Sequence, residues 1–316
     1  MTRVNWSGRT GFIAALTGAA LVSLGAALIS GSGPSASEFA GITPEAVRTD
    51  VAPLTRVEVQ TIDGEYVLAR REAGWVMPDK ADFPVVPEKA EMLMRSLDQA
   101  MVIEAKTSLP ERYDALGLGD PEDGGFGAKL TLEPGGMSLV FGVRGARHYL
   151  RRESNPRAYL IDQAMPPLHN AVWWIDLSET GLPRPSSDIV QLDVHASGQS
   201  RRFVKPAGVW IDGVSEAPVP ALKESALQFM SDALSGFTAE DVRASTGLAP
   251  SVQYRLVFAD GTVGVIEFVT EDGEIWTRFD FRGDGDWSVY EGREFRLDAL
   301  TLSDLLADEL VSASSE

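Results

Sequence analysis

The sequence predicts an α+β protein, in which an N-terminal transmembrane helix is followed by two tandem, similar strand–helix–strand units dominated by antiparallel sheet. Three observations predict this fold. Residues 11–30 form one apolar stretch without a charge. The chain beyond it contains many short segments in which apolar and polar residues alternate, the period of half-buried strands. An order of strands, proline, helix, Gly-Leu segment and hairpin occurs twice along the chain.

The apolar stretch, GFIAALTGAALVSLGAALIS, is the predicted anchor. As a helix rising about 1.5 Å per residue, it would span the roughly 30 Å of hydrocarbon in a bilayer. Arg3 and Arg9 precede it, and the next basic residue is Arg48. The positive-inside rule therefore places residues 1–10 in the cytoplasm, and everything after the linker, residues 31–50, outside the inner (cytoplasmic) membrane.

Two further interpretations of this stretch follow from its composition. A cleavable signal peptide is the alternative to an anchor, but its apolar core usually has about 7–15 residues, fewer than here. Small residues spaced four apart would let a second membrane helix approach closely, although a segment rich in alanine and glycine also produces such a stripe by chance. The predicted contact residues of the membrane helix are Ala15, Ala19, Ser23 and Ala27.

The composition excludes several classes of function. The 316 residues include 28 Lys and Arg against 46 Asp and Glu, a formal net charge of −18. Since binding to phosphates depends on Lys and Arg, this acidity argues against a nucleic-acid partner. The chain contains no cysteine, which excludes disulfides, cysteine nucleophiles and thiolate metal sites. We expect no cofactor.

The first predicted unit covers residues 51–181. Its helix begins after a proline, and its hairpin turns at Pro134-Gly135-Gly136. The predicted strands are Leu54–Thr61, Glu65–Arg71, Gly74–Met77, Ala128–Glu133 and Met137–Val143; the helix follows Pro87, with Met92, Leu93, Leu97 and Met101 on one face; and the Gly-Leu segment is Tyr113–Leu118.

The second predicted unit covers residues 182–316, after a proline-rich boundary at Gly181–Ser187. It repeats the order of the first unit and ends in a helical tail over Phe295–Val311. Its predicted strands are Ile189–His195, Ser200–Lys205, Gly208–Ile211, Gln253–Ala259 and Thr262–Thr270; its helix follows Pro220, with Leu222, Ala226, Phe229, Met230 and Leu234 on one face; and its Gly-Leu segment is Ser245–Leu248.

Tryptophans are the candidate partner-binding residues. Trp75 and Trp210 occupy equivalent positions in the two units, where we expect them to fill the cores. Trp173 and Trp174 are adjacent in a segment predicted to be a strand, so one would point inward and the other outward. The outward side chain would mark a partner surface or a sugar-stacking platform, because tryptophan is enriched at binding hot spots.

The sequence contains only weak candidates for catalytic and metal-binding residues. Asp280, Asp284 and Asp286 could supply oxygen ligands to Ca²⁺, but their spacing does not match a calcium loop. The sequence favours a hairpin turn there, between strands over Trp276–Phe281 and Trp287–Tyr290. The sequence contains no nucleophile elbow and no phosphate-binding loop. The three histidines, His148, His169 and His195, do not have the spacing of metal ligands. We therefore expect no catalytic residues.

Several segments together resemble a known family. Trp75 in Gly-Trp-Val, Tyr113 with Leu116-Gly117-Leu118, and Tyr159-Leu160-Ile161-Asp162 occur in an order similar to the bacterial membrane-anchored family catalogued as domain of unknown function 4340. The likeness covers about Leu54 to Leu177 and extends more weakly to the C-terminus. The resemblance implies an N-terminal anchor, an extracytoplasmic body and association with ABC-type transport systems of the gliding-motility auxiliary kind. It implies no catalytic residues.

These observations lead to one functional prediction and two alternatives. The prediction is a non-enzymatic, single-pass membrane protein with an extracytoplasmic body, an accessory or scaffold component of an ABC-type transport or cell-envelope assembly. Its partners would be the membrane, through the N-terminal helix, and ABC-type transporter subunits, by resemblance. The first alternative is an extracytoplasmic module that binds a glycan or a divalent cation. The remote alternative is a hydrolase whose site is assembled from distant residues.

Overall fold

The computed structural model describes residues 51–178, 180, 184–236, 239–307 and 310. The predicted anchor, the linker and the stripe of Ala15, Ala19, Ser23 and Ala27 lie outside these residues, so they stay predictions. Within the described residues, none of the helices combines the length and the apolar character that crossing a bilayer requires.

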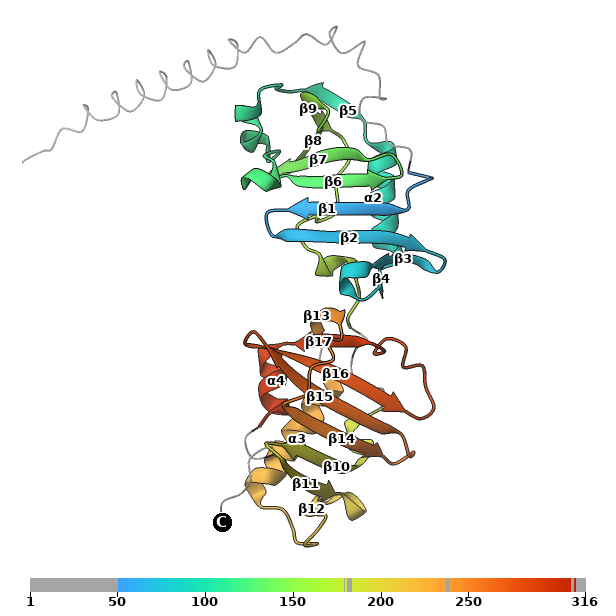
Figure 1. Ribbon diagram of the computed structural model, residues 1–316, viewed down its shortest axis with the longest axis vertical. Helices are drawn as coiled ribbons and strands as arrows, with labels where there is room; N and C mark the ends of the chain where they lie inside the picture. The colour runs from blue at the N-terminus through green and yellow to red at the C-terminus, as the bar shows by residue number, and fades with distance from the viewer. Residues whose placement is uncertain (1–50, 179, 181–183, 237–238, 308–309, 311–316) are drawn as a thin grey trace, which may run out of the picture.

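The body is mostly antiparallel sheet with few helices, as predicted (Figure 1). The first sheet has nine strands in the order β4-β3-β2-β1-β6-β7-β8-β9-β5. Each strand of this sheet pairs with its neighbours in antiparallel fashion. The strands are β1 (Arg56–Thr61), β2 (Gly64–Arg71), β3 (Gly74–Met77), β4 (Phe83–Pro84), β5 (Val102–Ala105), β6 (Ala128–Glu133), β7 (Met137–Arg144), β8 (Arg147–Arg152) and β9 (Asn155–Ile161).

The second sheet has eight strands in the order β12-β11-β10-β14-β15-β16-β17-β13. Its hairpin β14–β15 turns at Asp260-Gly261, where the sequence predicted a turn. The strands are β10 (Ile189–Ala196), β11 (Gln199–Val204), β12 (Ile211–Asp212), β13 (Ala239–Ala244), β14 (Val252–Phe258), β15 (Val263–Glu271), β16 (Glu274–Arg282) and β17 (Arg293–Leu297).

The two sheets have the same topology, which agrees with the near-repeat found in the sequence. In each sheet the first strand of the unit lies inside, next to the hairpin, and the strand that follows the helix lies at the edge. An isolated bridge between Ile211 and Pro218 stands where β4 lies in the first sheet. The edge strands β5 and β13 even share an irregularity in register, between Val102 and Glu104 in one and between Ala239 and Asp241 in the other.

The two long helices, α2 (Pro87–Gln99) and α3 (Ala221–Gly236), lie on one side of the sheets (Figure 1). The predicted face of α2 is partly wrong. Leu93 and Leu97 are buried together with Ala90, three and four residues apart, which leaves Met92 to one side and exposed. Met101 is exposed because the helix ends at Gln99 and the chain turns extended at Ala100.

The predicted face of α3 is also partly wrong. Ala226, Met230 and Leu234 are buried, as expected, and Leu227 completes this buried stripe. Phe229 is instead exposed, because it lies beside this stripe. Leu222 is exposed although it stands four residues before Ala226, in the first turn of the helix.

The predicted strand at Trp173 and Trp174 is wrong, because both residues lie in the short 3₁₀ helix η7 (Val172–Trp174). The Asn170 side chain accepts a hydrogen bond from the Trp173 N–H at 3.1 Å, and this local bond favours a turn over an extended strand. Trp174 is fully buried, and its Nε1 donates to the Tyr66 hydroxyl at 2.8 Å. Trp173 is half-buried, with the Lys89 ammonium 5.0 Å from its ring centroid.

The predicted helical tail begins instead with a strand. Residues 293–297 form β17, which fills the sheet between β16 and β13 and buries Phe295 and Leu297 in the core. The helix α4 (Ala299–Leu305) starts only after Asp298, whose carboxylate accepts hydrogen bonds from the N–H groups of Leu300 and Thr301 at 3.0 Å.

The predicted strand Trp287–Tyr290 is a turn within a loop, residues 283–292, that joins β16 to β17. The segment does not pair as a strand because its aromatic side chains pack against the core side of the sheet. The rings of Tyr290 and Trp287 lie 5.1 and 5.5 Å from the ring of Phe281.

The two units meet end to end (Figure 1), and their buried apolar side chains form one continuous cluster. The short helix η3 (Pro78–Lys80) of the first unit lies against β13. Lys80 Nζ is 2.6 Å from Asp241 Oδ1, and only 18% and 15% of these side chains are exposed. Arg293 donates to the Ala81 carbonyl at 3.2 Å and lies 5.2 Å from the Phe83 ring.

We expect Trp174→Ala to lower the free energy of unfolding by about 4 kcal/mol, because it empties a fully buried aromatic site and removes the donor to Tyr66. Chemical denaturation of the full chain measures this loss. Trp173→Ala is the matched control and should lower the free energy by less than half as much, since Trp173 is half-buried. Equal losses for the two variants would contradict the packing described here.

Candidate functional site

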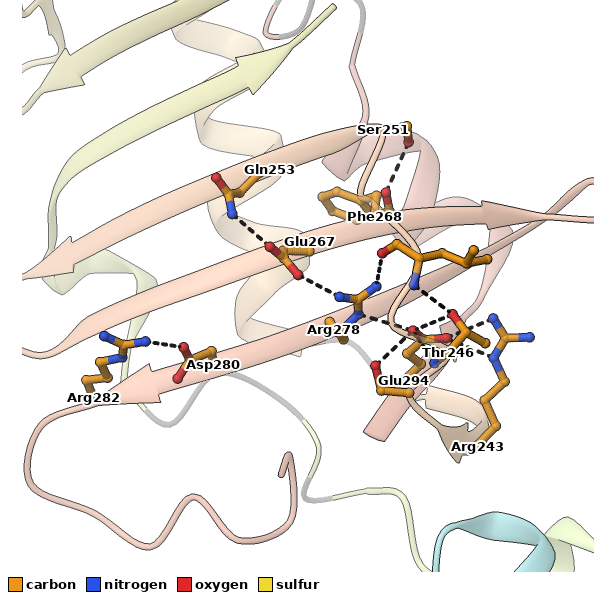
Figure 2. Close-up of polar contacts among 12 residues, drawn as sticks. Arg243, Thr246, Ser251, Gln253, Glu267, Phe268, Arg278, Asp280, Arg282 and Glu294 are labelled. Carbon is orange, nitrogen blue, oxygen red and sulfur yellow. Dashed lines mark hydrogen bonds and ion pairs between the residues drawn. The ribbon is translucent and has the colours of Figure 1, made fainter. Parts of the chain in front are cut away.

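The candidate site lies on the outer face of the second sheet, the face opposite the core. Arg278 of β16 is held there between two carboxylates on neighbouring strands (Figure 2). Its Nη1 is 3.1 Å from Glu267 Oε2 on β15, and its Nε is 3.1 Å from Glu294 Oε1 on β17. Its Nη2 donates to the Leu248 carbonyl at 2.5 Å. The guanidinium therefore joins two strands to the Gly-Leu segment.

Glu294 is the centre of this network, because its carboxylate is fully buried and receives donors from several sides. Besides Arg278, it accepts from Arg243 Nε at 2.9 Å, and from the N–H and hydroxyl of Thr246 at 3.1 Å. Burial raises the pKa of the Glu294 carboxyl, but the bonds from Arg243 and Thr246 outweigh burial and hold the pKa below its ordinary value. Glu294 is therefore a structural anion.

Arg243 extends the network toward the edge of the sheet. Its Nη1 is 2.6 Å from Glu271 Oε2, and its guanidinium lies 4.1 Å from the centroid of the Trp276 ring. Such stacking on tryptophan stabilises a guanidinium in addition to its ion pairs. Carboxylates and guanidinium groups thus balance one another across the strands.

The first unit has the same arginine at the same place. Arg151 of β8 pairs with Val140 and Ala158, and Arg278 of β16 pairs with Glu267 and lies beside Glu294 in the equivalent register. Arg151 Nε donates to the Leu118 carbonyl at 3.3 Å, and Arg278 donates to the equivalent Leu248 carbonyl through Nη2.

What differs between the units is how the charge of the arginine is balanced. In the first unit the strand neighbours are apolar, and Asp120, just beyond the Gly-Leu segment, pairs with Arg151. Residues 119–127 then continue over the sheet, where Glu122 reaches Lys129 at 2.9 Å. In the second unit only residues 249–251 separate the Gly-Leu segment from β14, so this cover is absent from the described chain.

A cavity of about 430 Å³ lies beside Arg278 in the second unit. Strand β16 pairs with β17 only at Thr277, opposite Phe295, and the loop 283–292 closes the gap beyond that point. Burial raises the pKa of the Tyr290 hydroxyl to about 12, so this lining group stays a neutral phenol. The charged and aromatic lining residues include Glu267, Arg278, Asp280, Trp287, Tyr290 and Glu291.

The structure does not bring the predicted metal ligands together. Asp280 pairs with Arg282 at 2.8 Å, and the Asp286 carboxylate accepts from the Ser288 N–H at 3.0 Å. The main-chain carbonyl of Asp284 accepts a hydrogen bond from Arg184 at 2.8 Å. Among the residues that the structure describes, no three or more His, Asp or Glu side chains converge as a metal site.

The histidines do not form a catalytic constellation. His195 Nδ1 lies 2.6 Å from Ser200 Oγ, two exposed side chains on the paired strands β10 and β11, and in the described part of the chain no carboxylate contacts this pair. A histidine without such a partner lacks the group that orients the base in a triad. His169 lies 3.5 Å from Asp63, and burial lowers the pKa of His148.

Sequence analysis missed the site around Arg278. One signal was present, since Glu267, Arg278 and Glu294 each occupy the polar position of an alternating strand. Which polar positions of different strands face one another depends on register and strand order, and these come only with the fold.

No family model matches the chain, and no curated protein matches it. The resemblance to the membrane-anchored family therefore stays a prediction from the residues quoted above.

We expect Glu294→Gln to lower the free energy of unfolding by about 3 kcal/mol, because it leaves two guanidinium groups without their shared buried anion. Chemical denaturation of the full chain is the measurement. Asp280→Asn is the matched control, since its pair with Arg282 is exposed and should contribute less than about 1 kcal/mol. A loss as small as that of the control would show that Glu294 does not hold the network together.

The network also predicts a dependence of stability on pH. A carboxyl whose pKa is lowered in the folded state stabilises the protein above its unfolded pKa, and this contribution is lost as the pH falls through the folded pKa. The free energy of unfolding should therefore decline below about pH 4.5, the ordinary value for Glu294. Glu294→Gln should decline less steeply, and parallel curves from denaturation at each pH would contradict the assignment.

Proposed function

We propose that the protein is a non-enzymatic, single-pass membrane protein whose body lies outside the inner membrane, as an accessory or scaffold component of an ABC-type transport or cell-envelope assembly. One observation carries this proposal. Two sheets of the same topology are joined end to end by paired charges and a continuous apolar cluster. Such a body is an extended platform for protein contacts.

The polar groups of the outer faces support a scaffold over an enzyme. Glu294 is held by Arg243 and Arg278, and Asp193 on β10 is paired with Arg202 at 2.7 Å and Arg255 at 3.5 Å. Catalytic acids and bases need a pKa near the working pH and access to a reacting atom. Glu294 lacks both properties, because its pKa is held below the ordinary value and its carboxylate is buried.

Location and partners rest on the sequence. The uncharged residues 11–30, preceded by Arg3 and Arg9, support a membrane anchor with the body outside. The net charge of −18 favours partners other than nucleic acids. The association with an ABC-type system comes from the family resemblance alone.

The cavity beside Arg278 supports the ligand-binding alternative. It offers carboxylates, a guanidinium and the rings of Trp287 and Tyr290 to a polar ligand such as a glycan. The three candidate metal ligands do not support binding of a divalent cation, because each contacts a different partner: Asp280, Asp284 and Asp286.

Affinity purification of the full chain in a mild detergent, with mass spectrometry of the accompanying proteins, tests the proposal. We expect ABC-type membrane and ATPase subunits to accompany the chain reproducibly, and to be lost when residues 11–30 are replaced by an unrelated membrane span. An unchanged melting temperature of the exchanged variant is the control for folding. Recovery of the chain alone would contradict the accessory role and favour the ligand-binding alternative.

A further inference from the structure

The contact between the two units uses an edge that occurs a second time in the same chain, where no other part of the described residues covers it. In the second unit the edge strand β13 is covered by the η3 end of the first unit. The equivalent edge strand of the first unit is β5, which lies at the far end of the body, away from the second unit (Figure 1).

Two charged residues on the second unit hold the covered edge. Asp241, just past the register shift in β13, accepts the Lys80 ammonium at 2.6 Å. Arg293, at the start of β17, donates through Nε and Nη2 to the Ala81 carbonyl at 3.3 and 3.2 Å, and lies over the Phe83 ring. The edge thus recognises an ammonium, a main-chain carbonyl and an aromatic ring on one short tip.

The uncovered edge has the same chemistry at the same register positions. Glu104 follows the equivalent register shift in β5, at the position of Asp241. Arg157 precedes Ala158 and Tyr159 in β9, at the position of Arg293 before Glu294 and Phe295. These correspondences follow from strand pairing, independently of any similarity in sequence.

Both side chains of the uncovered edge are accessible. Glu104 is 44% exposed and pairs only with its neighbour Lys106, at 2.5 Å, among the contacts in the described chain. Arg157 is exposed, and its Nη1 donates to the Lys106 carbonyl at 3.0 Å. Both bonds stay within this edge of the sheet. The Glu104 carboxylate can therefore accept, and the Arg157 guanidinium can donate, further hydrogen bonds to a docked partner.

Apolar side chains make covering this edge favourable. Met101 and Ile103 are 60% and 57% exposed, and Ile103 stands where the covered edge carries Glu240. Burying apolar surface removes it from water and so stabilises a complex, before the costs of association. The free edge is therefore more apolar than the edge already covered within the chain.

We propose that the β5 edge docks the end of a further sheet unit of this fold, carried by a partner protein, whose short tip presents a lysine to Glu104 and a carbonyl and aromatic ring to Arg157. A second copy of this chain is not the partner. Its free end, beside β12, has Ser215 where Lys80 stands and Glu216 where Ala81 stands. This inference deepens the proposed scaffold function and rests on it.

Grafting the docked tip onto the free end tests the proposal in solution. Residues 212–218 of the full chain are replaced by residues 77–84 (MPDKADFP), which gives each molecule both halves of the contact. Because the contact is head to tail, we expect open chains of molecules whose sedimentation coefficient rises with concentration in detergent, while the unaltered chain sediments as single copies. Adding Glu104→Lys to the graft should abolish the rise, since two ammonium groups then meet.

The outcomes separate clearly. A folded graft, with the melting temperature of the unaltered chain, that stays a single copy overturns the proposal. If the graft does not fold, Ser215→Lys in the unaltered loop replaces it, and its failure to associate overturns the proposal equally. Association of the unaltered chain that Glu104→Lys abolishes would overturn the choice of partner. Since this test needs no transporter subunit, its failure is distinguishable from failure of the accessory role.

Discussion

The arrangement of polar side chains on the outer face of the second sheet is determined by the positive charge of Arg278, which must be neutralised. Its guanidinium is held between Glu267 and Glu294 and also binds the carbonyl of the Gly-Leu segment. One buried carboxylate, Glu294, thereby ties together β16, β17 and β13, through Arg278 and Arg243. Because a buried charge without a partner is costly, each member of the network specifies the position of the others.

The two units share one topology but balance the charge of the equivalent arginine in two different ways. In the first unit Arg151 makes the same bond to a Gly-Leu carbonyl, but its charge is balanced by Asp120 on the covering segment. The strands beside it can then be apolar, with Val140 and Ala158 fully buried. In the second unit the balancing charges lie on the strands, and the covering segment is short. A cavity forms in one unit and a small apolar cluster in the other.

The same comparison distinguishes the covered and uncovered edges. An edge strand presents unpaired polar groups and is usually protected. Strand β13 is protected by the first unit, through Lys80 and Arg293. The edge formed by β5 and the neighbouring β9 presents Glu104, Arg157 and the apolar Met101 and Ile103 without such cover in the described chain. Because the two units have the same topology, the contact that covers β13 within the chain indicates the kind of contact that a partner would make at β5.

The predictions that succeeded and those that failed differ in physical kind. Hairpins and most strands were predictable because alternation and turn residues are local properties, as at Pro134-Gly135-Gly136. The errors involved residues whose conformation depends on distant partners. Trp174 lies in a 3₁₀ turn beside Tyr66, and the segment at Phe295 is a strand because the sheet has a vacancy between β16 and β13 that only the assembled fold defines.

The sequence by itself determined the repeated order of elements, the antiparallel character of the body and the absence of cysteine chemistry. These follow from the apolar–polar period, the turn residues and the composition, which are local properties of the chain. Only the tertiary structure decided that Glu267, Arg278 and Glu294 meet, and that Glu104 and Arg157 repeat the chemistry of Asp241 and Arg293. The physical reason is that strand order and register bring together side chains far apart in sequence, and a shift of one residue would turn each of them to the opposite face.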